Sequence, residues 1–192
     1  MNDMYVISVD TNGLPINGDF SKVDLVSFSI VQVNFHDMSH VREPLSLLIK
    51  VDELNGTEKY HGWTKGLIDE IGVSLDEAIT ELLNYFLIAY GNSTEVKVND
   101  IQLIGVNIYN YVMPILKKYL QMYEINLPFC KNHIDISSAC KILLNTDYFD
   151  DTLDALGLQM NKIRNSGVKM DGMIDVINTL RKLIMEPLLD GK

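Results

Sequence analysis

Hydrophobic residues in the first part of the chain follow the pattern of three strands joined by short turns. Residues 4–10 form an apolar run, residues 24–35 form a second one rich in Val, Ile and Phe, and residues 44–51 form a third. Between the first two runs, Gly13 and Gly18 enclose turn-forming residues. Connections this short cannot carry a crossover, so we predict an antiparallel three-strand meander.

The rest of the chain alternates helices with short strands. Ser74 and Glu77 have the spacing of a capping box, and the apolar residues after them recur every three or four positions until about Gly91. Later elements are predicted as a strand over 101–106, a helix over 110–123, a strand over 132–136, a helix capped by Ser137 or Ser138, a helix-turn unit over 152–158 and a helix over 171–185. This alternation predicts an α/β layered fold.

Length and composition are those of one globular domain. The chain has 192 residues, of which 47% are hydrophobic and 22% are charged, so we expect a single domain over residues 1–192. No apolar run reaches the roughly 20 residues of a membrane helix, and the acidic N-terminus lacks a signal-peptide pattern. We therefore expect a soluble, cytoplasmic protein with no membrane partner. Cys130 and Cys140 give no disulfide framework and are expected to stay unpaired.

The formal net charge of −10 argues against a surface that embraces nucleic acid over its whole extent. It does not exclude a local site, because carboxylates that bind a metal add to the acidic count and the metal then supplies positive charge. The net charge alone therefore neither supports nor excludes a protein that binds nucleic acid at a local site.

Asp10 ends the first apolar strand and is followed by Thr11, Asn12 and a glycine turn. This stretch resembles the first motif of the DEDD family of 3'-5' exonucleases, an apolar strand followed by Asp-x-Glu and then Thr-Thr-Gly-Leu. The resemblance implies that Asp10 is a metal ligand and that Asn12 stands where the family has its Glu ligand. Without the resemblance, Asp10 is a strand-end residue that forms an Asx turn with the residues after it.

The order of the predicted elements is similar to that of the same family over nearly the whole chain. The resemblance implies an α/β, ribonuclease H-like mixed sheet, with an antiparallel three-strand meander plus parallel strands, flanked by helices. The chain is similar in outline to phage exonuclease A and to the proofreading domains of polymerases.

Residues 105–116 resemble the family's second motif, a common form of which is Gly-Tyr-Asn-Ile-x-x-Phe-Asp-x-Pro-Tyr-Leu. The match includes Gly105, Asn107 and Pro114, but Val112 takes the position of the ligand Asp. The resemblance implies a nucleic-acid contact for Asn107, whereas its place before a helix favours a capping role. Valine cannot ligate a cation. A slight shift of the register would bring Asn110 near this position, where its amide would be a weaker, neutral ligand for a hard ion.

Residues 170–180 resemble the third motif, His-x-Ala-x-x-Asp followed by a helical run. Asp175 takes the ligand position and Gly172 the position of the small residue, while Met170 replaces the His that would act as general base. In the tyrosine subclass of the family, the base would stand one residue later, at Asp171. Without the resemblance, Asp175 is a solvated helix residue.

The family's chemistry sets how much these replacements matter. Two-metal phosphodiester cleavage holds two divalent cations about 4 Å apart with converging carboxylates. Asp10 and Asp175 remain as implied ligands, but Asn12 and Val112 remove about half of the expected negative charge. Met170 removes a proton acceptor that typically contributes 10²–10⁴-fold to the rate. The implied cofactor is Mg²⁺ or Mn²⁺ if any part of the site is retained, and none otherwise.

Three functions remain open from the sequence. The first is an exonuclease-fold protein with a degenerate two-metal site, retained for binding single-stranded nucleic acid or a protein partner. The second is an active 3'-5' exonuclease with an altered ligand set drawn from Asp135, Asp154 or Asp171. The third is a non-catalytic protein-interaction or assembly subunit. Lys169, in the most basic third of the chain, is interpreted either as part of a solvated face or as a guide for a nucleic-acid strand toward Asp175.

Overall fold

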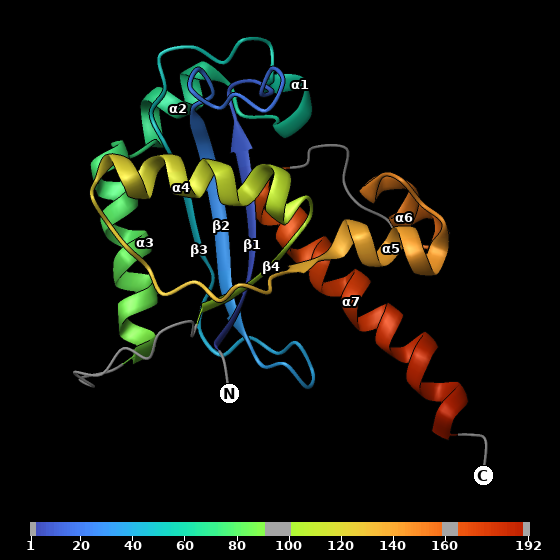
Figure 1. Ribbon diagram of the computed structural model, residues 1–192. Coiled ribbons are helices and arrows are strands. Elements are labelled where there is room, and N and C mark those ends of the chain that lie inside the picture. The colour runs from blue at the N-terminus through green and yellow to red at the C-terminus, as the bar shows by residue number, and fades with distance from the viewer. Residues whose placement is uncertain (1–2, 91–100, 159–164, 190–192) are drawn as a thin grey trace.

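The computed structural model describes residues 3–90, 101–158 and 165–189, which form a central mixed sheet with helices on both faces (Figure 1). The strands lie side by side in the order β3-β2-β1-β4-β5. Their bounds are β1 Asp3–Thr11, β2 Leu25–Val33, β3 Leu45–Leu48, β4 Ile101–Gly105 and β5 Ile134–Asp135.

Both kinds of strand pairing expected from the sequence are present. The pairs β1–β2 and β2–β3 are antiparallel, which confirms the predicted meander. The pairs β1–β4 and β4–β5 are parallel, so the sheet is mixed. The parallel pairs place the carboxyl ends of β1, β4 and β5 at one edge of the sheet, which is where α/β proteins commonly form their sites.

The helices agree with the predicted order but include two that the sequence pattern did not indicate, α1 and α2. The bounds are α1 Glu58–His61, α2 Lys65–Ile71, α3 Leu75–Tyr90, α4 Met113–Met122, α5 Ile136–Leu144, α6 Phe149–Ala155 and α7 Ser166–Leu189. A single π-helical turn, η1, covers Ile108–Val112 and runs directly into α4.

The starts of α5 and α7 differ from the sequence predictions. Helix α5 is capped by Asp135, whose carboxylate accepts from the Ser137 amide, so neither Ser137 nor Ser138 is the cap. Helix α7 begins at Ser166, five residues before the predicted start at 171. The second difference matters for function, because it places Lys169 in the first turn of a helix.

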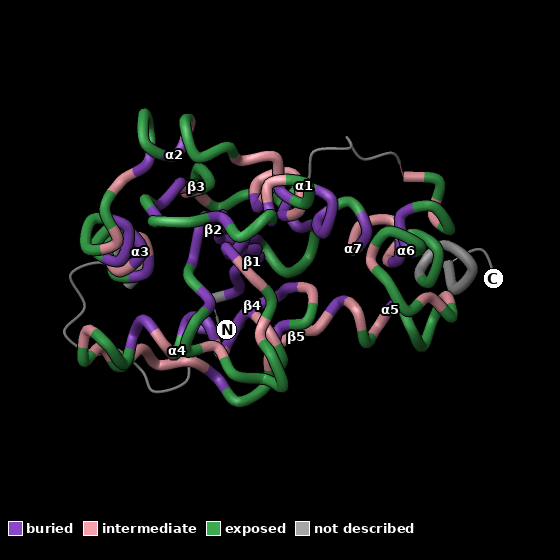
Figure 2. Tube along the Cα trace, turned by 90° about the horizontal axis from the view of Figure 1, so that it is seen from above, coloured by how far each residue is buried: buried purple, intermediate pink, exposed green. Residues whose placement is uncertain are grey.

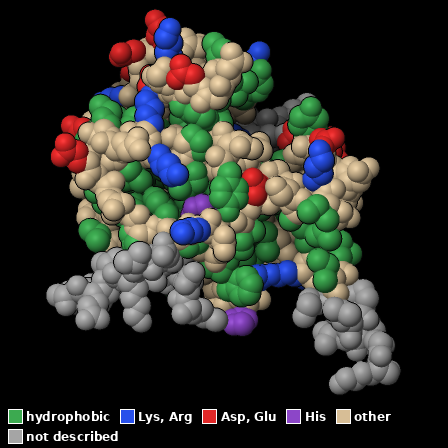
Figure 3. Space-filling model, in the orientation of Figure 1, with side chains coloured by type: hydrophobic (Ala, Val, Ile, Leu, Met, Phe, Trp, Pro, Cys, Tyr) green, Lys and Arg blue, Asp and Glu red, His purple; other side chains and the backbone are tan. Residues whose placement is uncertain are grey.

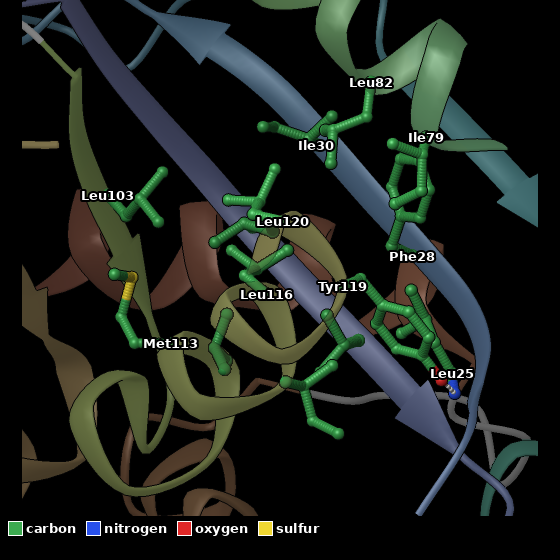
Figure 4. Packing of buried hydrophobic residues seen from close by; sticks show 14 of the residues in the cluster. Leu25, Phe28, Ile30, Ile79, Leu82, Leu103, Met113, Leu116, Tyr119 and Leu120 are labelled. Atoms are coloured by element: carbon green, nitrogen blue, oxygen red, sulfur yellow. Dashed lines mark hydrogen bonds between the residues drawn. The ribbon is translucent and has the colours of Figure 1, made fainter. Parts of the chain in front are cut away.

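Alternation along β1 divides the interior into two layers. Tyr5, Ile7 and Val9 belong to the hydrophobic core formed with α3 and α4. Met4 and Val6 belong to a second core formed with α5, α6 and α7. Figure 4 shows the first core, with side chains of β2, β4, α3 and α4 meeting over the sheet. In Figure 2 the buried trace is concentrated along the strands, with exposed helix surfaces outside it.

None of the helices within the described ranges has the length and apolar character needed to cross a membrane. Cys130 and Cys140 are both buried and both free, as predicted.

Tyr119 of α4 provides a test of how α4 is attached to the sheet. Its hydroxyl accepts a hydrogen bond from the Leu25 amide at 2.9 Å and donates to Asp24 Oδ1 at 3.4 Å. Burial raises the pKa of Tyr119 to about 12, so the phenol is neutral in the folded protein. We expect Tyr119→Phe to lower the free energy of unfolding in urea by about 1–3 kcal/mol, because the buried Leu25 amide loses its acceptor.

Tyr123→Phe is the matched control, since the Tyr123 hydroxyl bonds to Asp76 near the surface. We expect that substitution to change the free energy of unfolding by less than about 0.5 kcal/mol. Equal losses in the two variants would contradict the assignment of a specific buried bond to Tyr119.

Candidate functional site

A cavity of about 410 Å³ lies at the carboxyl end of β1, beside α1 and the first turn of α7. It brings together four residues singled out from the sequence, namely Asp10, Asn107, Val112 and Lys169. The other three, Asn12, Met170 and Asp175, are not among the residues that line it.

Asp10 lies at the centre of this site and is only 2% exposed. Its Oδ1 accepts from the Lys169 ammonium at 2.5 Å. Its Oδ2 accepts from Ser27 Oγ at 2.6 Å, from the Ser166 amide at 2.7 Å and from Trp63 Nε1 at 3.3 Å. These bonds hold a buried carboxylate, which needs such compensation to remain ionised in the interior.

The local sequence explains why these groups meet. Asp10 has the same parity along β1 as Met4 and Val6, so its side chain lies on the α7 side of the sheet. The Ser166 amide belongs to the first turn of α7, where backbone N–H groups have no partner within the helix. Lys169 follows three residues later, on the same face of the helix.

A row of serine hydroxyls continues the polar network away from Asp10. Ser166 Oγ lies 2.9 Å from Ser27 Oγ and 3.0 Å from Ser29 Oγ, and Ser46 donates to Ser29 at 2.8 Å. Sequence reasoning missed this row. The available signal was Ser27 and Ser29, two polar residues on one side of a strand that is otherwise apolar except for Gln32.

Asn12 has a structural role outside the cavity. It is 4% exposed, and its Oδ1 accepts from the Asp24 amide at 2.7 Å. Its side-chain amide donates to the Glu53 carbonyl at 3.2 Å and to Asp24 Oδ2 at 3.3 Å. All of these partners lie in loops, so the hydrogen bonds of Asn12 connect the segment after β1 with the segments before β2 and after β3.

Val112 places an apolar side chain at the cavity wall. It is 2% exposed and packs into the core beneath α4, and its side chain has no polar atom. The π turn sets its position, since the Val112 amide donates to the Asn107 carbonyl five residues earlier at 3.3 Å. Such turns often occur at functional sites, where they redirect a side chain.

Asn107 does not cap this turn through its side chain. It adopts a left-handed conformation with φ of 54°, and its amide donates to Asp135 Oδ1 and to Ser137 Oγ, both at 3.2 Å. Gly105, two residues earlier, packs closely against β1, because a Cβ there would lie 3.0 Å from the Ile7 carbonyl oxygen.

Met170 and Asp175 lie on α7, away from the cavity. Met170 is 2% exposed and packs in the core of α5, α6 and α7. Asp175 is exposed, and its position six residues beyond Lys169 corresponds to about 9 Å along the helix and about 240° around it.

Helix α7 leads away from the carboxyl end of β1 as the chain proceeds (Figure 1). Asp171 and Asp175 are both exposed on this helix, and partial desolvation raises the pKa of Asp171, with Asp175 adding to the rise and His40 opposing it. His40 bridges to Val33, which pairs with Met4 at the start of β1. The structure therefore does not bring Asp175 to Asp10.

The acids considered for an altered ligand set do not line the cavity either. Asp135 caps α5 and also accepts from the Ile108 amide, while Asp154 and Asp171 are exposed on α6 and α7. Asp150 is the second carboxylate in the cavity lining. Within the described ranges, no group of three or more His, Cys, Asp or Glu side chains is arranged to hold a metal ion.

His61 is a buried neutral group in the cavity wall that the sequence did not single out. Its Nδ1 accepts from the Trp63 amide at 3.1 Å, so Nε2 carries the proton and donates to Thr57 Oγ1 at 3.0 Å. Thr57 in turn donates to the Leu54 carbonyl at 2.6 Å. Burial lowers the pKa of His61, with the Asp10 carboxylate opposing that effect. This chain of bonds positions Trp63 over Asp10.

No family model and no curated protein matches the sequence. Among solved structures, the nuclease domain of 3'hExo, a DEDDh family member bound to rAMP, superposes with a TM-score of 0.65 at 13% identity. The match covers 99% of this chain and 93% of that one. The chain has the fold of the DEDD-family 3'-5' exonucleases.

Exonuclease I gives the same result. The E. coli enzyme in complex with a dT13 oligonucleotide has a TM-score of 0.69 at 12% identity, and the match covers 99% of this chain and 43% of that one. Exonuclease I from Methylocaldum szegediense has a TM-score of 0.71 at 16% identity, with 95% and 41% covered. This chain thus spans about two-fifths of the length of those exonuclease I chains. The likeness confirms the ribonuclease H-like mixed sheet of the DEDD exonuclease fold.

Substitutions of the ion pair test its contribution to folding. We expect Lys169→Met to lower the free energy of unfolding by about 2 kcal/mol, because it leaves the buried Asp10 carboxylate without its cation. This loss is smaller than that expected for a fully buried pair, since Lys169 is partly exposed. Adding Asp10→Asn removes the unpaired charge. We therefore expect the two losses to be less than additive by about 1 kcal/mol or more in a double-mutant cycle measured in urea.

Lys65→Met is the matched control, since Lys65 pairs with Asp69 on the exposed surface of α2. We expect its effect to stay within about 0.5 kcal/mol. Full additivity of the Asp10 and Lys169 substitutions would contradict a coupled pair.

Proposed function

We propose that this chain is a 3'-5' exonuclease-like, nucleic-acid-processing protein that has lost its two-metal site and has a binding or accessory role. The observation that carries the proposal is the ion pair between the Lys169 ammonium and Asp10 Oδ1, at 2.5 Å. In this reading the lysine supplies the positive charge that a divalent ion supplies at the corresponding carboxylate of a two-metal nuclease.

The donor set around Asp10 does not fit a divalent cation. A metal ion bound to Oδ1 would have to displace the Lys169 ammonium, and the two positive charges would repel each other if the lysine stayed nearby. The other oxygen already accepts from Ser27, Ser166 and Trp63. Since Val112 contributes no oxygen, a second ion would have no ligand from that side of the cavity.

A different register of the third motif agrees with this geometry. Residues 164–169 read Arg-Asn-Ser-Gly-Val-Lys, six positions before the stretch that ends at Asp175. When these residues are aligned with His-x-Ala-x-x-Asp, Ser166 takes the position of the small residue and Lys169 takes the position of the ligand Asp. Arg164 falls at the His position but lies outside the described residues. We favour this register because Ser166 and Lys169 are the α7 residues that contact Asp10.

Single-stranded nucleic acid is the ligand class that the proposal assigns to the cavity. Among the structures with this fold, E. coli exonuclease I is seen with dT13 and dA16 oligonucleotides. The cavity lining of this chain keeps polar groups suited to a nucleotide, among them Asn107, Tyr111 and Lys169. Because the chain carries a net charge of −10, we expect modest affinity that weakens as salt rises.

Nuclease activity is the direct test of the loss of the metal site. We expect no trimming of single-stranded DNA or RNA labelled at the 5' end when the protein is incubated with Mg²⁺ or Mn²⁺, because Asp10 is bound by Lys169. Denaturing gel electrophoresis would measure it. Trimming that disappears in Asp10→Ala would overturn the proposal and support an active exonuclease with an altered ligand set.

Binding without metal is the second test. We expect fluorescein-labelled dT13 to bind with the same anisotropy change and affinity in EDTA as in Mn²⁺, since no metal participates. Raising salt from 50 to 200 mM should weaken the complex. A requirement for Mn²⁺ would contradict the proposal, and so would the absence of binding even at low salt, which would favour an assembly subunit without a nucleic-acid role.

A further inference from the structure

A second hollow lies apart from the Asp10 cavity, between α4 and the segment 124–133 that follows it. We call it the α4 groove. Its volume is about 570 Å³, within the roughly 300–1,000 Å³ typical of ligand sites. Figure 3 shows this face of the molecule, with hydrophobic side chains exposed around α4 and Lys and Arg side chains among them.

The α4 groove is mainly apolar. Met113 and Leu120 contribute buried side chains from α4, and Ile125, Leu127 and Phe129 contribute half-buried ones from the segment opposite. Such a surface gains free energy when a large apolar side chain covers it.

The charged residues that line the α4 groove are both lysines, and the exposed Glu124 lies just beyond the end of α4, outside this lining. Lys117 on α4 and Lys131 on the opposite segment are both exposed, and none of the described residues that line the groove is Asp or Glu. This is unusual on a chain whose net charge is −10. The two lysines favour an occupant that carries carboxylates beside its apolar side chains.

His133 adds a directed donor. Its Nδ1 accepts from the Leu103 amide at 3.1 Å, which assigns the ring proton to Nε2. Burial, together with the nearby Lys117, lowers the pKa of His133 and keeps the ring neutral. A neutral Nε2–H can donate to a peptide carbonyl or a carboxylate.

Nucleic acid fits the α4 groove less well. The aromatic rings of the groove are packed against one another, with Tyr109 and Phe129 each about 6 Å from His133. Phe129 also packs edge-on against Phe86 of the core. Of these three rings only Tyr109 is exposed, which leaves little ring surface for stacked bases, and two lysines release few counterions from a polynucleotide.

We propose that the α4 groove docks a short acidic peptide segment of a partner protein, with one or two large apolar side chains in the groove and carboxylates against Lys117 and Lys131. This surface is separate from the Asp10 cavity, so its occupancy does not depend on whether Asp10 holds a metal. It gives the accessory role proposed above a place to bind a partner.

Peptide binding tests the proposal. The probe is fluorescein-labelled Asp-Glu-Leu-Phe-Glu-Asp, compared with Lys-Lys-Leu-Phe-Lys-Lys and with Asp-Glu-Ser-Ser-Glu-Asp. We expect only the first to bind, with a dissociation constant on the order of 10–100 µM. Lys117→Glu combined with Lys131→Glu is expected to weaken it about tenfold or more. No binding of the first peptide at 1 mM, or equal binding of all three, would overturn the proposal.

The control for charge is Lys50→Glu combined with Lys182→Glu, which makes the same change in net charge at the β3 edge of the sheet and on α7. We expect peptide affinity to stay within about twofold in that variant. Leu127→Ser, which keeps both lysines, is expected to weaken the peptide as well. Circular dichroism would show that each variant folds.

Labelled dT13 separates this proposal from the one for the cavity. We expect its affinity to be alike in the two double-lysine variants. If Lys117→Glu with Lys131→Glu abolishes oligonucleotide binding while the peptide binds unchanged, the α4 groove is a nucleic-acid surface and the peptide proposal fails.

Discussion

A single buried carboxylate sets the arrangement of this protein around its site. Asp10 is removed from water at the end of β1, so each of its oxygens must receive donors from the protein. The donors come from β2, from the segment before α2 and from the first turn of α7. Hydrogen bonds and an ion pair to one carboxylate therefore fix the relative positions of elements that are distant in sequence.

Much of the fold could be predicted from local pattern. The strands of the meander follow from their apolar runs and short turns, and the start of α3 follows from Ser74, whose hydroxyl accepts from the Glu77 amide. The start of α7 was missed because Ser166 and Gly167 are typical turn residues. Asn165 provided the opposing signal, since its side chain accepts from the Val168 amide and caps the helix.

The site could be predicted only in part. Asp10 and Val112 do line one cavity, because Asp10 lies near the carboxyl end of β1 and Val112 lies in the turn after β4, which is parallel to β1. The partner of Lys169 could not be predicted, because 159 residues separate it from Asp10 and an isolated lysine in a basic segment suggests a solvated face. Asn12 likewise depends on contacts with Asp24 and Glu53 that only the folded chain creates.

The crowded bonding of Asp10 has a consequence for how this chain can change by mutation. Replacing Lys169 alone leaves a buried negative charge without its cation. Replacing Asp10 alone removes the acceptor of the Lys169 ammonium and of the Ser166 amide, whereas Trp63 Nε1 keeps Ser27 Oγ as an acceptor at 3.1 Å. If Asp10 holds no metal, as proposed above, a metal centre at this position would require several substitutions together, since each single replacement of a bonded partner costs folding stability. Single substitutions of the ion pair are therefore selected against, and the pair is expected to persist as the rest of the sequence changes.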